Sequence, residues 1–113
     1  PIYTRRLLQL CILYDAQHVI LAHNHPSGNA AASRNDITAT HQVEMALESI
    51  DATLNDHIIF AGEDYNSFAR SGWLNTVKED VRAYRRQETE NARQKERELL
   101  KSAGFCPLAQ GEG

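Results

Sequence analysis

The sequence predicts a mixed α/β domain over residues 1–75, followed by a long charged helix over residues 76–103. Helix-like and strand-like segments alternate along the first part, in the order helix, strand, helix, strand, strand. Clusters of Gly, Pro, Asn and Ser separate these segments, as turns and loops require. The whole chain has 113 residues, a length that suits one domain of this class.

The first helix and the first strand are expected over residues 4–15 and 18–23. Residues 4–15 repeat apolar side chains at nearly the 3.6-residue period of a helix, and Thr4 is a suitable N-terminal cap. Residues 18–23 are short and rich in apolar and β-branched side chains, which is typical of a buried strand. Residues 24–32 hold a Pro, a Gly and two Asn, so we expect a loop there.

A second helix is expected over residues 34–50, and two further strands over 57–61 and 65–69. Mostly apolar side chains recur every three or four residues and form one stripe along this helix that continues past its end. They are Ile37, Thr40, Val43, Leu47, Ile50 and Leu54. Residues 57–61 form a short apolar run, and a turn after it makes residues 65–69 its hairpin partner. Because three strands make a small sheet and the chain has no initiator Met, we expect further strands upstream of Pro1.

The last third of the chain has a different composition. Residues 76–113 hold 8 basic and 7 acidic side chains, whereas residues 1–75 hold 4 basic and 8 acidic ones. The basic side chains of helix 76–103 could form a stripe for DNA, but interleaved glutamates favour a solvated, ion-paired surface. This helix is a candidate for binding a partner or a second copy of the chain. Residues 104–113, with three Gly and a Pro, are expected to be a disordered tail.

The overall charge and hydropathy argue against several classes of protein. With 12 basic and 15 acidic residues, the net charge is -3 and the isoelectric point is near 5.9, unlike that of a strongly basic nucleic-acid binder. No apolar run is long enough to cross a membrane, and the first residues lack the pattern of a signal peptide. Cys11 and Cys106 make no disulfide framework, so we expect a cytoplasmic protein with no membrane partner.

The residues most informative about function lie between His23 and Asp36. His23 and His25 are separated by one residue at the end of an expected strand, so their imidazoles point to the same side. A loop then turns the chain back, and Asp36, in the first turn of the next helix, can face them. Two imidazoles and one carboxylate leave a fourth tetrahedral position open for water, as in catalytic zinc sites. We therefore expect one zinc ion with a bound water as the cofactor.

Ser33 is a candidate for the catalytic machinery beside these ligands. Bound zinc lowers the pKa of its water toward ~7 and polarises a carbonyl oxygen. The Ser33 hydroxyl could donate a hydrogen bond to the oxyanion that then develops. A complete hydrolase also needs a general base near neutrality, commonly a Glu or a His.

Other interpretations of these residues stay open at this point. Ser33 and Asp36 also fit a capping pair of the form S-x-x-D, which needs no metal. The two histidines could be surface residues, part of a His-Asn-His nuclease, or ligands of a two-His-one-carboxylate iron site. His57 begins an apolar strand and is expected to be a hydrogen-bonded structural residue, while His18 and His41 are expected to be solvated.

The segment from His23 to Asp36 resembles the metal-binding signature of the JAMM/MPN+ metalloprotease superfamily, His-x-His-Pro followed by Ser-x-x-Asp. The match is closer still to the RadC-like family of DNA repair proteins, because the segment reads His-Asn-His-Pro-Ser-Gly. Further strings resemble motifs of that family: Asp36-Ile37-x-x-Thr40, Asp56-His57-Ile58-Ile59, Ser67-Phe68 and Gly72. The resemblance covers about residues 1–75, and residues 76–113 match no part of the family pattern.

This resemblance implies a fold, a ligand set and an activity. It implies a curved, mixed β-sheet flanked by helices, with the layering of JAB/MPN and cytidine-deaminase-like folds. It implies His23, His25 and Asp36 as zinc ligands and Ser33 as the transition-state donor. It also implies a metallopeptidase or isopeptidase acting on a peptide or isopeptide substrate, with an association with DNA repair. The chain departs from the family pattern at Ala32, where a Pro is usual, and in lacking the catalytic Glu upstream of the first helix.

Two functions follow from these observations. The first is the zinc-binding part of a RadC-like metallohydrolase, which by itself hydrolyses little because loss of a general base typically costs about 10²–10⁴-fold in rate. The alternative is a non-catalytic MPN-like interaction module in DNA processing, whose long helix binds the partner. A catalytic Glu supplied by an upstream segment or another chain would favour the enzyme. A salt-sensitive DNA affinity that depends on residues 76–113 would favour the module.

Overall fold

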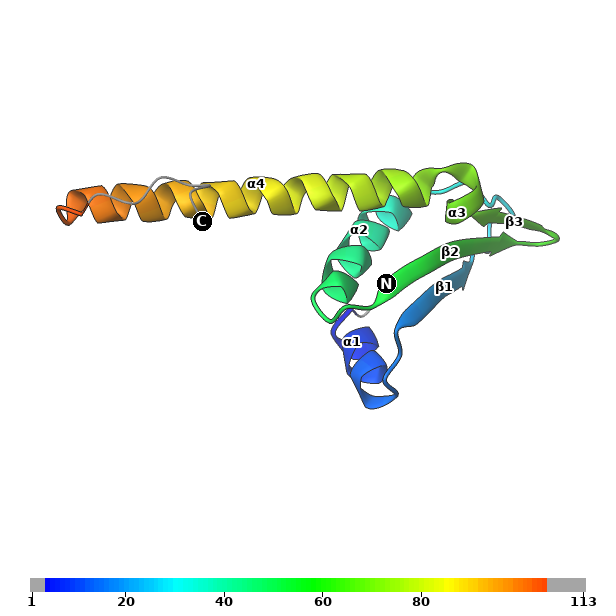
Figure 1. The fold of residues 1–113 in the computed structure, drawn as a ribbon. Helices are drawn as coiled ribbons and strands as arrows, with labels where there is room; N and C mark the ends of the chain where they lie inside the picture. Colours follow the sequence, from blue (N-terminus) through cyan, green and yellow to red (C-terminus); the bar gives the residue numbers. More distant parts are fainter. Residues whose placement is uncertain (1–3, 106–113) are drawn as a thin grey trace. The chain divides into compact units, whose positions relative to one another are not determined.

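The computed structural model describes residues 4–105 and confirms the expected fold class, a mixed α/β domain with a long C-terminal helix (Figure 1). The chain divides into two units, Pro1–Val81 and Arg82–Gly113. The elements, in chain order, are α1 (Thr4–Leu13), β1 (His18–Asn24), α2 (Arg34–Glu48), β2 (Thr53–Ala61), β3 (Asp64–Ser67), α3 (Phe68–Ser71) and α4 (Trp73–Ser102).

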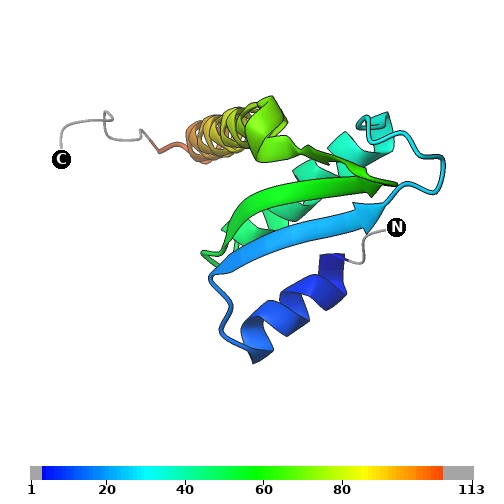
Figure 2. The ribbon, with the colours of Figure 1, turned by 90° about the vertical axis from the view of Figure 1, so that its right-hand side faces the viewer.

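The three strands of the first unit form one mixed sheet in the order β1-β2-β3. β1 and β2 are parallel, with His23 opposite Ile59. β2 and β3 are antiparallel, with Ile58 opposite Ser67. Parallel strands need a long crossover connection, and here α2 supplies it, lying behind the sheet in Figure 2. Because β1 and β2 run in the same direction, their C-terminal ends, near residues 24 and 61, lie side by side at one end of the sheet. The start of α2 lies next to them.

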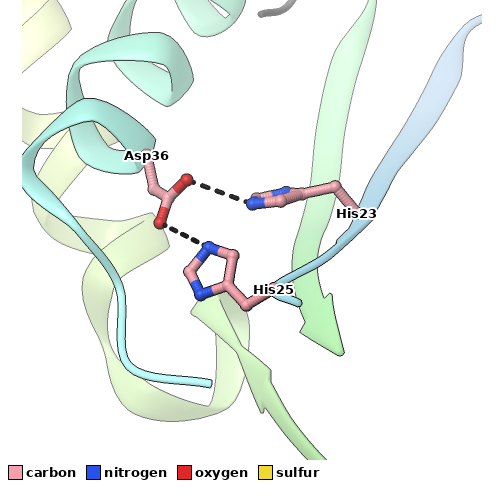
Figure 3. Close-up of side chains that lie close together, drawn as sticks. All are labelled: His23, His25 and Asp36. Atoms are coloured by element: carbon pink, nitrogen blue, oxygen red, sulfur yellow. Dashed lines mark ion pairs between the residues drawn. The ribbon is translucent and has the colours of Figure 1, made fainter. Parts of the chain in front are cut away.

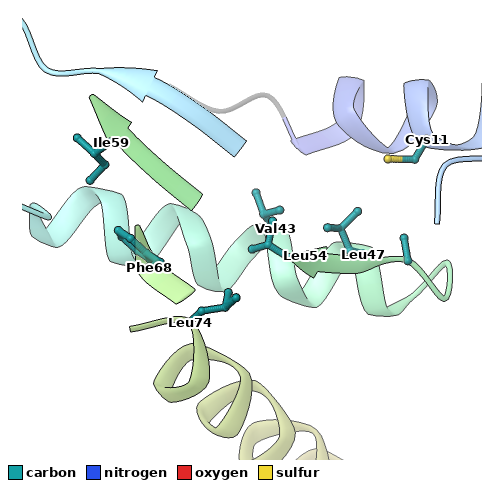
Figure 4. Close-up of a cluster of buried hydrophobic side chains, with 8 residues drawn as sticks. Cys11, Val43, Leu47, Leu54, Ile59, Phe68 and Leu74 are labelled. Atoms are coloured by element: carbon teal, nitrogen blue, oxygen red, sulfur yellow. The ribbon is translucent and has the colours of Figure 1, made fainter. Parts of the chain in front are cut away.

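The apolar core lies between one face of this sheet and the helices α1 and α2 (Figure 4). The fully buried apolar side chains of the cluster are Val43, Leu47, Leu54, Ile59 and Phe68, with Cys11, Ala52 and Leu74 at its margins. Burying large apolar side chains of this kind stabilises a fold by about 1.5–3 kcal/mol each. The core therefore fixes α2 against β2, and with it the side chains at the start of α2.

An irregularity in the β1–β2 register decides which side chains of β2 face this core. Val19 lies opposite Leu54, but Ile20 lies opposite Asp56, so β2 contains one extra residue at this point. Such a bulge reverses the alternation of side chains between the two faces. As a result Leu54 and His57, three residues apart, are both fully buried on the core side.

The bounds of β2 and β3 differ from the sequence-based expectation, and the short helix α3 was not expected. β2 begins at Thr53 rather than at residue 57, so Leu54 belongs to this strand and does not continue the stripe of the second helix. β3 ends at Ser67 rather than at residue 69, because the Ser67 side chain accepts the N–H of Arg70 and begins the short helix α3. A turn at Gly72, with φ of 92°, separates α3 from α4. Only a residue without a Cβ adopts this backbone conformation easily.

The start of α4 packs within the first unit, through the buried side chains Leu74, Val77 and Val81. Their spacing of three and four residues places them on one side of the helix. Lys78, on the same stretch, forms an ion pair with Glu44 of α2, with Nζ 3.2 Å from Oε1. The first turns of α4 are therefore part of the domain that contains the sheet.

In the second unit, α4 continues as a mostly exposed helix with charged side chains. Arg97 lies 3.2 Å from Glu90, which is an ion pair of the kind expected for a solvated helix. No helix of the described part of the chain is both long and apolar enough to cross a membrane. Residues 106–113, including Cys106 and most of the tail expected to be disordered, lie outside the described residues.

Candidate metal centre

His23, His25 and Asp36 lie together where β1 ends and α2 begins (Figure 3). One ligand atom from each of these side chains lies within 4.8 Å of the others. Asp36 Oδ1 is 3.1 Å from Nε2 of His23, and Asp36 Oδ2 is 3.1 Å from Nε2 of His25. The three side chains expected from the sequence to be ligands thus face one another, with the carboxylate between the two imidazoles.

The end of β1 holds the two histidines on the same side. His23 belongs to β1, and the backbone N–H of His25 donates to the carbonyl of Phe60 at 2.7 Å, which extends the pairing with β2 beyond Asn24. Because side chains alternate along paired strands, residues two apart share one face. The strand pairing therefore sets the direction of both imidazoles toward α2.

The loop after His25 fixes the orientation of its ring. Nδ1 of His25 lies 2.8 Å from the carbonyl oxygen of Asn29, which can only accept a hydrogen bond. Nδ1 therefore carries a hydrogen, and Nε2, which faces the Asp36 carboxylate, is the nitrogen left for a metal. Gly28, with φ of 82°, donates its N–H to the carbonyl of His25 and closes the turn that brings Asn29 back.

Asp36 is fixed by a capping box at the start of α2. The Ser33 hydroxyl accepts the N–H of Asp36 at 3.1 Å, and Asp36 Oδ2 accepts the N–H of Ser33 at 2.8 Å. The capping interpretation of this pair is therefore confirmed, and the same carboxylate also faces the histidines. Burial raises the pKa of Asp36, but the hydrogen bonds of Ser33 and the charges of His23 and His25 outweigh it, so the pKa lies below its usual value.

His57 is the residue near the site whose role the sequence did not indicate. It was expected to be a hydrogen-bonded structural residue, and it is fully buried and hydrogen-bonded, but its partner is His23. Nε2 of His57 is 2.9 Å from Nδ1 of His23, and Nδ1 of His57 is 2.8 Å from the hydroxyl of Thr40. Burial is the main cause that lowers the pKa of His57, and the charge of His23 adds to it.

An open pocket of about 690 Å³ adjoins the cluster. His23 and Asn24 of β1 line it together with five residues of α2. The α2 residues are Asn35, Asp36, Thr38, Ala39 and Gln42, which lie on one side of the helix. Ser33 is not among the lining residues, although it lies next to Asp36 in the capping box. Amide and hydroxyl groups therefore surround the accessible side of the site.

The family model for the RadC-like JAB domain matches residues 1–73. The chain belongs to this family. Curated relatives include UPF0758 proteins of Idiomarina loihiensis, 46% identical over 74 residues, and of Bordetella bronchiseptica, 47% identical over 73 residues. These matches cover 66% and 65% of this chain but 33% and 32% of the relatives, so the chain spans about a third of their length.

Two dipeptides of this RadC-like domain lie against each other behind the site. Asp56 and His57 are neighbours on β2, so their side chains leave the strand on opposite faces. Asp56 accepts hydrogen bonds from the Ser67 hydroxyl and, at 2.9 Å, from the N–H of Ala69, which anchors the start of α3. The ring of Phe68 packs on His57, with centroids 4.6 Å apart. The strings that resembled family motifs thus hold β2, β3 and α3 around His57.

The cluster holds a single carboxylate. Within residues 4–105, the group of side chains that could hold a metal consists of His23, His25 and Asp36, with no Glu among them. The other two histidines lie elsewhere: Nδ1 of His18 is 3.3 Å from Asn55, and His41 contacts Asp80. Two imidazole nitrogens and one carboxylate oxygen are a donor set suited to a divalent transition metal.

Proposed function

We propose that this RadC-like domain binds one zinc ion through Nε2 of His23, Nε2 of His25 and the carboxylate of Asp36. The observation that carries the proposal is the convergence of these three groups, with both carboxylate oxygens 3.1 Å from an imidazole nitrogen. Two imidazoles and a carboxylate are the protein ligands of several catalytic zinc sites, which keep a further position for water or substrate. The adjoining pocket supports access to that position.

The reaction class proposed for the complete protein is hydrolysis of an amide or isopeptide bond. A bound metal would supply an activated water at neutral pH and polarise the carbonyl of the substrate. In the capping box the Ser33 hydroxyl accepts a hydrogen bond, so its own proton stays available for donation to a developing oxyanion. Asp36 is fixed by Ser33, which keeps the carboxylate ionised and directed at the two histidines.

The present chain is proposed to bind metal with little hydrolysis. A general base has to take a proton from the attacking water, and no Glu joins the cluster within the part of the chain that the structure describes. The activity of a whole protein of this family, and its link to DNA repair, are extensions of this proposal. A peptidase assay on a full-length relative, with the histidine equivalent to His25 replaced by Ala, tests the reaction class.

Among the described residues no Glu joins the cluster, and this favours a second candidate function, a non-catalytic interaction module in DNA processing. In this account the metal would stabilise the domain, and the charged helix of residues 82–102 would bind the partner. DNA affinity measured at several salt concentrations separates the two candidates. A salt-dependent affinity that disappears on removal of residues 82–113 favours the module, while peptidase activity in the full-length relative favours the enzyme.

The metal proposal is tested by elemental analysis of the purified chain after zinc loading and removal of free metal. We expect one zinc per chain in the wild type and much less than one in His25→Ala. His41→Ala is the matched control, because His41 is also a partly buried histidine beside a carboxylate but lies outside the cluster. Equal metal content in all three proteins would overturn the ligand assignment.

A further inference from the structure

We propose that Thr40 and His57 are positioning residues that set the tautomer of His23, so that Nε2 of His23 is its metal-binding atom. This inference rests on the proposed metal site. Its basis is an unbroken series of hydrogen bonds that runs from the backbone of α2 to the His23 ring. Neither positioning residue offers an atom to the cluster itself.

Thr40 decides which group donates and which accepts in each hydrogen bond of the series. Its hydroxyl donates to the carbonyl of Asp36 at 2.7 Å, and a hydroxyl has one hydrogen to give. Toward His57, 2.8 Å away, the Thr40 oxygen therefore acts as the acceptor. It follows that Nδ1 of His57 carries a hydrogen.

The same reasoning continues through the second ring. His57 is fully buried, which favours the neutral imidazole, and a neutral imidazole has one N–H and one bare nitrogen. With the hydrogen on Nδ1, Nε2 of His57 is an acceptor and receives the hydrogen of His23 Nδ1, 2.9 Å away. Nδ1 of His23 is thereby committed to His57, and Nε2, 3.1 Å from Asp36, is the nitrogen left for a metal. Without a metal, the Asp36 carboxylate can only accept, so a contact of this length requires a hydrogen on Nε2 as well.

The two ligand histidines differ in how their tautomers are set. His25 donates from Nδ1 directly to the carbonyl of Asn29, an acceptor that cannot reverse its role. His23 donates to another imidazole, which can act in either direction. The Thr40 hydroxyl fixes the direction of the bond between His23 and His57, because its only hydrogen is donated to the Asp36 carbonyl. Thr40 is thus needed to set the tautomer of His23 but not that of His25.

Burial and ring packing keep this series free of competing partners. The side chains of Thr40 and His57 are both fully buried, so water does not compete for their hydrogen bonds. Phe68, which is also fully buried, packs its ring on His57 and restricts its rotation. Such outer partners of a ligating histidine typically contribute about 10–100-fold to metal affinity.

The direct test is the histidine tautomer, read from long-range ¹H–¹⁵N correlation spectra of the metal-free chain at about pH 8, where ordinary imidazoles are neutral. We expect Nδ1 to carry a hydrogen in both His23 and His57, and Nε2 of His57 to be bare; Nε2 of His23, which faces the Asp36 carboxylate, does not decide the test. In Thr40→Val, which keeps the shape but removes the hydroxyl, we expect the Nε2–H form of both rings to gain population. A wild-type His23 whose Nδ1 is bare would overturn the inference.

Zinc affinity, measured by competition with a chelating dye, is the second readout. We expect Thr40→Val to bind zinc roughly 10-fold or more weakly than the wild type. Thr76→Val is the matched control, because the Thr76 hydroxyl also donates to a carbonyl four residues back, that of Gly72, but contacts no histidine. Equal affinities in the two variants would contradict the inference.

The two proposals fail in different ways. If the wild type takes up no zinc, the proposed metal function is wrong, but the tautomers in the metal-free chain still decide the role of Thr40. If Thr40→Val does not fold, the wild-type spectrum alone decides, because it requires no substitution. Zinc binding with the opposite tautomer in His23 would leave the metal site standing and remove the positioning role.

Discussion

The imidazole of His23 is hydrogen-bonded to that of the fully buried His57, with Nδ1 of the first 2.9 Å from Nε2 of the second. This contact follows from the sheet, since His23 lies opposite Ile59 and His57 is two residues earlier on β2. Diagonal neighbours of this kind lie on one face of adjacent strands. One candidate ligand is thus fixed by the core, whereas the other, His25, is fixed by a surface loop.

The first prediction concerns the pH dependence of stability in the metal-free chain. The pKa of His57 is lowered in the folded state, so the unfolded chain, with an ordinary pKa near ~6.5, takes up the proton first as the pH falls. The free energy of unfolding should therefore decrease as the pH drops below about 6.5. Urea denaturation at several pH values, with a chelator present, measures this dependence.

Two variants test whether His57 causes this pH dependence. His57→Gln removes the buried titrating group and should show a smaller decrease between pH 7 and pH 5 than the wild type. His41→Gln removes a partly exposed histidine that contacts Asp80 and serves as the control. A decrease of the same size in His57→Gln and the wild type would contradict the assignment.

The second prediction separates the capping role of Ser33 from the ligand role of Asp36. Ser33→Ala removes the acceptor for the Asp36 N–H and should lower the free energy of unfolding by about 1 kcal/mol, with zinc content unchanged. Asp36→Asn keeps an oxygen for the Ser33 N–H but removes the negative charge, so zinc content should fall strongly. Thermal denaturation and elemental analysis of both variants give the comparison, and loss of zinc in Ser33→Ala would contradict it.

The sequence predicts the local parts of this site well. One-residue spacing on a strand predicts that His23 and His25 share a face, and the S-x-x-D spacing predicts the capping box that holds Asp36. Each of these relationships depends on neighbouring residues alone. For the same reason the longer helices and the strands of the first unit were expected in the observed order, but the short helix α3 was not expected and several element ends were misplaced.

The contact between His57 and His23 could not be predicted in this way. It depends on the bulge in β2, which places His57 on the core side, and on the strand register that brings together two residues 34 positions apart in sequence. Thr40 appeared in the apolar stripe of the second helix, and its hydroxyl showed a role only once α2 was seen packed on β2. The segments 36–40 and 56–59, which resemble family motifs, indicated that these residues matter. They did not indicate that Thr40, His57 and His23 contact one another.

The third prediction concerns the core that supports His57. Phe68 is fully buried and packs on the His57 ring, so Phe68→Ala should destabilise the chain by about 3–5 kcal/mol. Phe60→Ala is the matched control, because Phe60 is 41% exposed on the sheet and should cost much less. Chemical denaturation of the two variants measures both values. Similar losses for the two would show that the core is not where the structure places it.

The fourth prediction is that the candidate metal centre belongs wholly to the first unit. A chain that ends after Val81 keeps the sheet, α1, α2 and the buried start of α4. It should fold, bind zinc with unchanged affinity and retain the amide NMR spectrum of residues 4–75. Loss of zinc binding in this shortened chain, with its fold intact, would show that residues 82–113 contribute to the site.

The central claim, that His23, His25 and Asp36 together hold a metal ion, is tested most directly by X-ray absorption spectroscopy of the zinc-loaded chain. We predict a first coordination shell of nitrogen and oxygen at about 2.0–2.2 Å, with scattering from two imidazole rings and no sulfur contribution. In His25→Ala the loaded zinc, if any remains, should show one imidazole fewer. A shell with sulfur at about 2.3 Å, or the same two-imidazole signal in His25→Ala, would contradict the assignment.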